Sequence, residues 1–94
     1  MSQKYFTSYS GIKLPLKLVG EISTTEIKNR NTFICAEYDE TDRLISLEHI
    51  VYSEPQLRHD YAYHDNGVLK LAEINNLAEE EINVLDFDEH GKPA

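Results

Sequence analysis

The chain has 94 residues, with 17 Asp and Glu against 9 Lys and Arg and a formal net charge of -8, and 40% of it is hydrophobic. This length and hydrophobic content predict one globular domain, residues 1–94, and a field of this sign excludes nucleic acid and membrane surfaces as expected partners. The single cysteine excludes an intrachain disulfide, and the lack of a signal-like N-terminal segment or a long apolar run predicts a cytoplasmic protein.

The N-terminal part, residues 5–20, is apolar and mostly irregular. Only from residue 12 to residue 18 do apolar and polar residues alternate with period two, which is typical of a half-buried strand. Pro15 lies within this segment and has no N–H for a ladder hydrogen bond. We therefore expect the strand at a sheet edge, where Pro15, Lys13 and Lys17 would hinder unwanted pairing.

A helix start follows the first strand. Ser23 and Glu26 have the spacing of a capping box, in which each side chain accepts a hydrogen bond from the other residue's backbone N–H. This predicts a short helix over residues 24–30. Such a helix is too short to persist alone, so Ile27 is expected to pack on the sheet.

The remainder of the chain is rich in β-branched, aromatic and aliphatic runs that suit strands. Ser53–Gln56 contains Pro55 and is expected to break the longest of these runs, while residues 75–81 are expected to form a single helical turn capped by Asn75 or Asn76. The predicted strands cover residues 32–38, 44–52, 58–63, 68–74 and 82–87.

Three segments share one pattern, residues 38–44, 63–69 and 87–93. Each has an aromatic residue, then polar turn formers, then Gly or Asp at the fourth position after the aromatic residue, and the aromatic residues are 25 and 24 positions apart. This pattern predicts three-residue hairpin loops in which positions 42, 67 and 91 take positive φ. The sequence therefore indicates repeated hairpins.

The motif Tyr-Asp-x-x-Gly-x-Leu resembles the YD or RHS repeats, and Tyr63–Leu69 is the closest match. This chain departs from it where Asp42 replaces Gly and His64 replaces Asp. The resemblance implies a β-hairpin and no activity. The segment Tyr5–Gly11 is also similar to the start of a family of small uncharacterised bacterial proteins, which likewise implies no function to transfer.

These elements predict a β-rich fold, all-β or α+β, with an antiparallel meander of about five or six strands and one short helix. In the second hairpin His59, Tyr61 and Tyr63 share one face, which together with Leu69 and Leu71 is expected to be the core face. The strand 44–52 has apolar residues on both sides. Its second face is therefore expected to be covered by the helix and the N-terminal segment, or by another chain.

Four histidines and two acidic segments are the candidates for a metal site, but their spacing does not favour one. His59 and His64 are separated by an odd number of positions on a strand, so they project to opposite faces. The acidic segments 39–42 and 86–89 lack the spacing of an EF-hand loop. Cys35, between Ile34 and Ala36, is expected to be a buried apolar residue. We predict no metal, cofactor or catalytic residue.

Tyrosines are numerous, six in all, and a tyrosine-rich sheet face is suited to binding. We therefore predict a protein-interaction module that acts through an aromatic sheet face or an edge, as a homodimer or with a protein partner. The residues predicted to contact the partner are Arg58, His59, Tyr61 and Tyr63. The alternative is a small-ligand or divalent-metal protein that uses the turn-end histidines and carboxylates. An enzyme ranks third, because no acid–base pair or nucleophile arrangement is visible.

Overall fold

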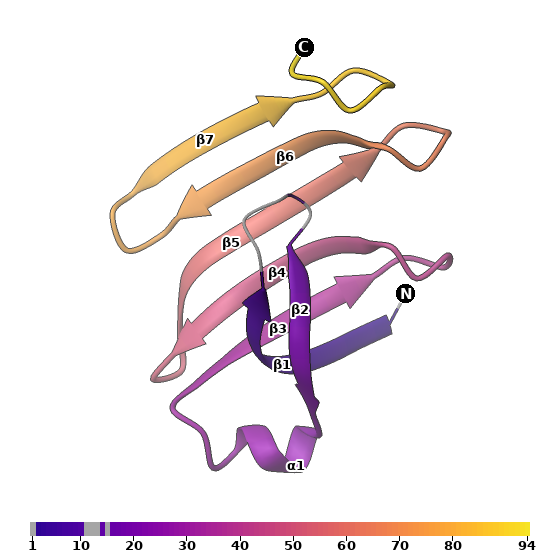
Figure 1. Ribbon diagram of the computed structural model, residues 1–94. Helices are drawn as coiled ribbons and strands as arrows, with labels where there is room; N and C mark the ends of the chain where they lie inside the picture. Colours follow the sequence, from indigo (N-terminus) through magenta and orange to yellow (C-terminus); the bar gives the residue numbers. More distant parts are fainter. Residues whose placement is uncertain (1, 11–13, 15) are drawn as a thin grey trace.

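The computed structural model describes residues 2–10, 14 and 16–94, and in this part of the chain it contains one short helix and seven strands in a single antiparallel sheet (Figure 1). The predicted β-rich fold is confirmed, although the strands outnumber the expected five or six. Their bounds are β1 Ser2–Ser10, β2 Lys17–Ile22, α1 Thr24–Ile27, β3 Thr32–Tyr38, β4 Leu44–Val51, β5 Glu54–Tyr63, β6 Leu69–Asn76 and β7 Glu81–Asp86.

The strand order across the sheet is β2-β1-β3-β4-β5-β6-β7, so β2 and β7 form its edges. From β3 onward each strand pairs with the next, as a meander does, whereas β1 lies between β2 and β3. The strand expected over residues 12–18 begins later, at Lys17, and it lies at an edge as predicted. The expectations for Pro15 and Lys13 fall outside the described residues.

Helix α1 begins with the predicted capping box. The Glu26 N–H donates to Ser23 Oγ at 3.2 Å, and the Ser23 N–H donates to Glu26 Oε1 at 3.3 Å. The helix ends at Ile27, earlier than expected, and Ile27 is half-buried. Local hydrogen bonding thus determines where this segment turns, and after Ile27 the Asn29 and Arg30 N–H groups donate to carbonyls only three residues back, so the α-helical pattern does not continue.

The three recurring turns have the expected backbone geometry, with φ of 62° at Asp42, 86° at Gly67 and 84° at Gly91. In the middle turn the His64 N–H donates to Val68 O at 2.8 Å and the Gly67 N–H donates to His64 O at 2.9 Å. Equivalent pairs of bonds close the other two turns. The positive φ predicted at these three positions is therefore confirmed.

Each turn places its aromatic residue directly opposite the residue six positions later. Tyr38 faces Leu44, Tyr63 faces Leu69, and Phe87 forms an isolated bridge with Pro93. Residues directly opposite each other in an antiparallel pair have their side chains on the same face and in contact. The sequence pattern therefore encodes a facing aromatic and aliphatic pair as well as a turn.

Register shifts beside two of these turns correct the expected side-chain faces. Between Glu37 and Tyr38 the pairing skips one residue of β4, so Leu44 and Leu47 lie on the same face and both are buried. The shift moves Leu44 to the core face, but residues 44–52 still carry apolar residues on both sides, because Ile50 lies opposite Phe33 on the other face. A matching shift in β5 and β6 puts Leu71 opposite Ala62, away from the core face on which it was expected.

The core lies on one face of the sheet and is covered by the N-terminal hairpin. Leu14, Leu16 and Leu18 pack against the core, and Figure 1 shows β2 crossing in front of the central strands. The backbone N–H of Leu16 donates to the Tyr61 hydroxyl at 3.4 Å. The buried apolar residues are Phe6, Ile34, Ala36, Leu44, Leu47, Tyr61, Leu69 and Ala72.

Two connections differ from their predictions. The break expected over Ser53–Gln56 is a tight turn at Tyr52 and Ser53, with φ of 49° and 68°, and β5 begins at Glu54 and includes Pro55. Positive φ at two consecutive residues is the geometry of a type I′ hairpin turn, usually made by Asn and Gly. The helical turn expected over 75–81 is a hydrogen-bonded turn in which the Glu79 N–H donates to Asn76 Oδ1 at 3.3 Å.

We expect opposite effects from two substitutions at positive φ. Gly67→Ala should lower the free energy of unfolding by about 1–2 kcal/mol, because a Cβ is strained in this region. No atom lies within 4 Å of the added Cβ, so backbone strain alone is measured. Ser53→Gly should raise the same quantity by about 1 kcal/mol. Denaturant unfolding followed by circular dichroism tests both, and equal effects of the two changes would contradict the strain argument.

Candidate functional site

The four residues predicted to contact a partner lie on two different faces of β5. His59 and Tyr61 are in the core, with 5% and 6% of their surface exposed, and Tyr63 is half-buried on the same face. Arg58 lies on the opposite face, which we call the open face because the N-terminal hairpin packs on the other side. In the folded chain the aromatic residues form part of the core and not an accessible surface.

The six tyrosines are divided between the two faces of the sheet, and only some of them lie on the face that the N-terminal hairpin covers. Tyr38, Tyr61 and Tyr63 pack in or against the core, while Tyr5 contacts Phe33 edge to face at 6.1 Å elsewhere on the sheet. Tyr9 and Tyr52 are the most exposed of the six, at 48% and 72%. The six tyrosines therefore do not gather on one accessible face.

His59 and Tyr61 form a buried hydrogen bond. Nδ1 of His59 lies 2.6 Å from the Tyr61 hydroxyl, which also accepts from the Leu16 N–H. The hydroxyl completes both contacts when its proton points toward an unprotonated Nδ1. Burial lowers the pKa of His59, and the Asp60 carboxylate opposes this effect in part. Burial also raises the pKa of Tyr61 to about 12. The neutral forms of both groups therefore hold the N-terminal hairpin onto β5.

On the open face Arg58 is held by carboxylates. Its guanidinium donates from Nε and Nη2 to the two oxygens of Asp60, both at 3.0 Å, and Nη1 lies 3.4 Å from Glu48 Oε1. All three side chains are about one-third exposed or more. Such partly exposed pairs contribute about 0–1 kcal/mol each to stability. The two carboxylates beside Arg58 offset its charge and so disfavour an anionic partner at this point.

Cys35 also lies on the open face, where it is half-buried rather than fully buried as predicted. Gln3 Nε2 donates to its sulfur at 3.1 Å, and burial raises the pKa of the thiol. The thiolate is the nucleophilic form of cysteine, so this environment disfavours a reactive role.

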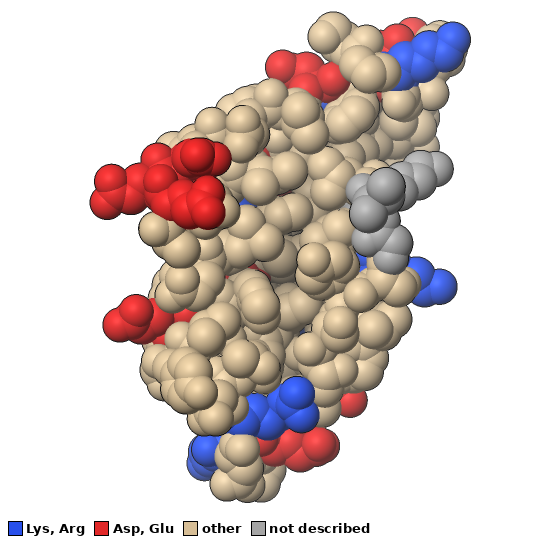
Figure 2. Space-filling view, turned by 60° about the vertical axis from the view of Figure 1, so that its left-hand side comes forward, with Lys and Arg blue, Asp and Glu red and all other residues tan. Residues whose placement is uncertain are grey.

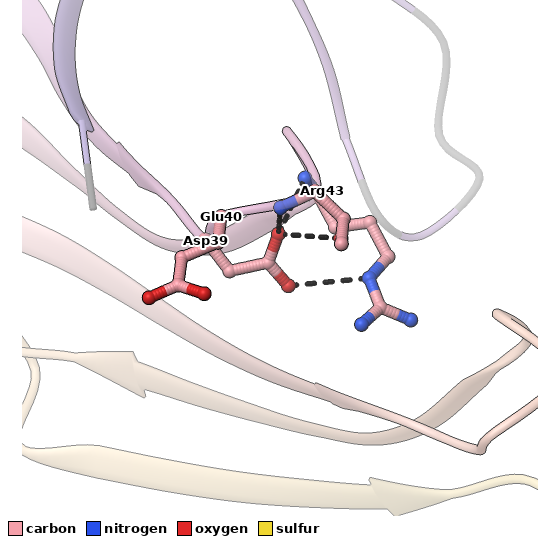
Figure 3. Close-up of a pocket in the computed structure, with 4 residues that line it drawn as sticks. Asp39, Glu40 and Arg43 are labelled. Atoms are coloured by element: carbon pink, nitrogen blue, oxygen red, sulfur yellow. Dashed lines mark hydrogen bonds and ion pairs between the residues drawn. The ribbon is translucent and has the colours of Figure 1, made fainter.

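A shallow depression lies at the turn between β3 and β4 and is lined by Asp39, Glu40, Thr41 and Arg43 (Figure 3). Asp39 Oδ1 accepts from the Thr41 N–H at 2.8 Å and the Arg43 N–H at 3.0 Å, and Oδ2 lies 3.2 Å from Arg43 Nε. These bonds, that from the Arg43 backbone foremost, lower the pKa of Asp39 to about 2. The Asp39 carboxylate thus organises the turn, and its oxygens are occupied by the turn itself.

The turn-end histidines and carboxylates show similar local bonding. His64 Nε2 lies 2.9 Å from Phe87 O, and Asp88 Oδ1 accepts from the His90 and Lys92 backbone N–H groups, both at 2.9 Å. Within residues 2–10, 14 and 16–94, no three His, Cys, Asp or Glu side chains converge as metal ligands. No helix in the described part of the chain is long and apolar enough to cross a membrane.

Strand β7 is the most exposed part of the sheet, since all six of its residues are exposed. Three of them are large and apolar, namely Ile82, Val84 and Leu85, with 60%, 53% and 41% of their surface accessible. Ile82 and Val84 pair with Asn75 and Glu73 and so continue the open face. An edge strand of this kind is a template for pairing with another chain.

The backbone orientation of β7 follows from two hydrogen bonds at its end. The Phe87 N–H donates to Lys70 O at 2.8 Å, toward β6, whereas Asp86 O accepts from the Ala94 N–H at 3.0 Å, away from β6. Alternation along the strand then directs the N–H and C=O groups of Ile82 and Val84 away from β6. No strand in the described part of the chain pairs with these groups.

The other edge is less suitable for pairing. Gly20, in the middle of β2, has a φ of 74°, which interrupts the regular spacing of backbone groups. No residue from Glu81 to Asp86 has positive φ. β7 is therefore the more regular edge; among the described residues, its outer backbone groups are free at Ile82 and Val84, and Ala94 bonds to it only at Asp86.

The sequence indicated that a sheet edge is available for binding, but Ile82 and Val84 were not among the residues predicted to contact a partner. Their alternation with Asn83 is visible in the sequence and predicts a strand. Whether a strand is central or at an edge depends on which other strands pair with it, and this is a tertiary property. Leu85 is also apolar, but it lies on the opposite face of the strand from Ile82 and Val84. Apolar residues on both faces were the local signal that this strand is not an ordinary half-buried strand.

The comparisons with known proteins identify a family but no activity. The model of a family described as "Family of unknown function (DUF6156)" matches residues 1–94. Neither a search of curated proteins nor a search of solved structures finds a match to the chain.

We expect stability to fall when His59 is protonated. Above the ordinary histidine pKa of about 6.5, His59 is neutral in both states and contributes no pH dependence. Below it the unfolded chain takes up a proton that the folded chain resists, because the folded pKa is lowered. The free energy of unfolding should therefore fall as pH drops from about 6.5 to 5, before most carboxylates titrate.

Thermal unfolding across this pH range tests the expectation. His59→Gln should flatten the decline, whatever its effect on stability at neutral pH. His90→Gln, at an exposed turn position, should leave the decline unchanged. If His90→Gln flattens the curve and His59→Gln does not, the buried hydrogen bond is not the cause.

Two proline substitutions test the orientation of the β7 backbone. Val84→Pro should change the free energy of unfolding by less than about 1 kcal/mol, because its N–H points away from β6. Leu85→Pro should lower it by about 1–3 kcal/mol, because its N–H points toward β6 and the bond is lost. Equilibrium unfolding of both variants measures the difference, and the reverse order would show that our assignment of the free edge is wrong.

Proposed function

This chain belongs to the family of unknown function DUF6156, and we propose that it is a protein-interaction module that binds an extended segment along the free edge of β7. The partner is a segment of another protein or β7 of a second copy. The bound segment would add one strand to the sheet, which is a common mode of peptide recognition. We further propose that this function is carried out in the cytoplasm.

One observation carries this proposal, the outward-facing backbone groups of Ile82 and Val84. Their N–H and C=O groups offer main-chain hydrogen bonds to a partner, and their exposed side chains offer apolar contact on one face. Main-chain bonds of this kind provide affinity, while alternate side chains provide selectivity. Both are available on β7 without moving any other strand.

The aromatic face is a poorer candidate than the edge. A partner could reach His59 and Tyr61 only if the N-terminal hairpin detached, which would expose Leu14, Leu16 and Leu18. Arg58 is accessible, but Asp60 and Glu48 already pair with it. Of the four residues predicted from sequence, Arg58 is the one that a segment extending from the edge across the open face would approach.

The alternative function, binding of a small ligand or a divalent metal at the turns, stays a prediction. The carboxylates of Asp39 and Asp88 are each occupied by backbone N–H groups of their own turn, and the His64 ring bonds to Phe87. A ligand would have to displace these bonds. No observation on the described residues favours it over edge binding.

Selection of short displayed peptides against the full chain tests the proposed function. We expect the selected peptides to shift the amide resonances of β7 and β6 more than those of the N-terminal hairpin. Val84→Pro should abolish binding, because it removes an outward N–H. Val84→Thr is the matched control and should retain binding, since it keeps the N–H and a branched side chain.

Two results would contradict edge binding. One is that selected peptides bind the Val84→Pro chain as tightly as the original chain. The other is that the largest resonance shifts lie around the turn at Asp39 or over the N-terminal hairpin.

A further inference from the structure

We infer that the segment bound by β7 is positively charged at both of its ends, and that it belongs to a partner protein and not to a second copy of this chain. This inference rests on the proposed function and concerns the same edge. It is carried by the distribution of charge along the strand together with the free backbone groups of Ile82 and Val84.

Carboxylates flank the apolar centre of β7 on both sides. Within residues 79–89 there are six acidic residues and no Lys or Arg. Figure 2 shows a large group of carboxylates at the left of the visible surface, whereas at the top right and at the bottom carboxylates lie beside Lys or Arg. The acidic residues of this segment are Glu79, Glu80, Glu81, Asp86, Asp88 and Glu89.

Self-pairing of β7 is opposed by these charges in either orientation. An antiparallel pair sets residues 79–81 of one copy against residues 86–89 of the other, and a parallel pair sets each acidic group against its own copy. Two like charges at about 4 Å repel by about 1 kcal/mol even in water, and both chains carry a net charge of -8. Charged residues at strand edges are a known means of preventing such pairing.

The same charges favour a basic segment. Six extended residues span about 20 Å, so Lys or Arg residues that lie on either side of a short β-forming centre reach both acidic groups at once. The centre of the segment would place β-branched residues beside Ile82 and Val84. The overall acidic field would also speed association with a basic segment.

Three capped synthetic peptides with one centre, Val-Thr-Val-Thr-Val, test this inference. Their flanks are two Lys, two Gln or two Glu residues on each side. We expect the Lys-flanked peptide to bind about tenfold more tightly than the Gln-flanked one, because several exposed ion pairs add small contributions, and the Glu-flanked one to bind least. This preference should largely disappear at about 1 M salt, where the Debye length is about 3 Å.

Protein variants separate the charges from the strand. Replacing Glu79, Glu80 and Glu81 together by Gln should remove most of the preference for Lys flanks and leave binding of the Gln-flanked peptide unchanged. The matched control replaces three other exposed carboxylates, Glu21, Glu40 and Glu54, and should keep the preference. A Lys-flanked peptide with a Gly-Pro-Gly-Ser-Gly centre, which cannot form a strand, should bind neither chain.

Each contrary result has a defined meaning. If the Gln-flanked peptide binds β7 as tightly as the Lys-flanked one, the charge inference is wrong and edge binding stands. If the Val84→Pro chain binds each peptide as tightly as the unmodified chain does, both the inference and the proposed function fail. If sedimentation equilibrium of the unmodified chain shows a dimer that Val84→Pro dissociates, the occupant of the edge is a second copy and the inference is overturned.

Discussion

A single-layered sheet must cover at least one of its faces, and in this protein the N-terminal hairpin provides the cover. The core face carries buried side chains from five strands, β1, β3, β4, β5 and β6, and Leu14, Leu16 and Leu18 lie against them. Two linked hydrogen bonds hold the hairpin to the sheet: the Leu16 N–H donates to the Tyr61 hydroxyl, and this hydroxyl bonds to His59 Nδ1. Without this cover the apolar residues of the core face would be exposed to water.

This arrangement decides which surfaces remain for function. Once the aromatic face is occupied, the open face and the two edges are what a partner can reach. The open face is polar at its centre, where Arg58 is paired with Asp60 and Glu48, and the β2 edge is interrupted at Gly20. The β7 edge combines unpaired backbone groups with exposed apolar side chains, so the proposed binding site follows from how the core is closed.

Features with local causes could be predicted from sequence, and those with distant causes could not. The capping box of Ser23 and Glu26, the strand Thr32–Tyr38 and the positive φ at Gly67 depend on neighbours a few residues away. The turn at Tyr52 and Ser53 was missed because neither residue is typical of its geometry. Strand β1 was missed because its position between β2 and β3 depends on pairing with residues far along the chain.

The sequence by itself determined the three recurring turns, because hydrogen bonds and φ preferences within a few residues specify them, and through these turns it determined the pairing of β3 with β4 and of β5 with β6. Only the tertiary structure decided which face of that sheet is closed and which strand lacks a neighbour. His59 and Tyr61 are core residues because a hairpin from the other end of the chain packs on them. Ile82 and Val84 are accessible because no further strand of the described chain follows β7 in the sheet. Both outcomes depend on contacts between distant segments, which alternation along a strand does not specify.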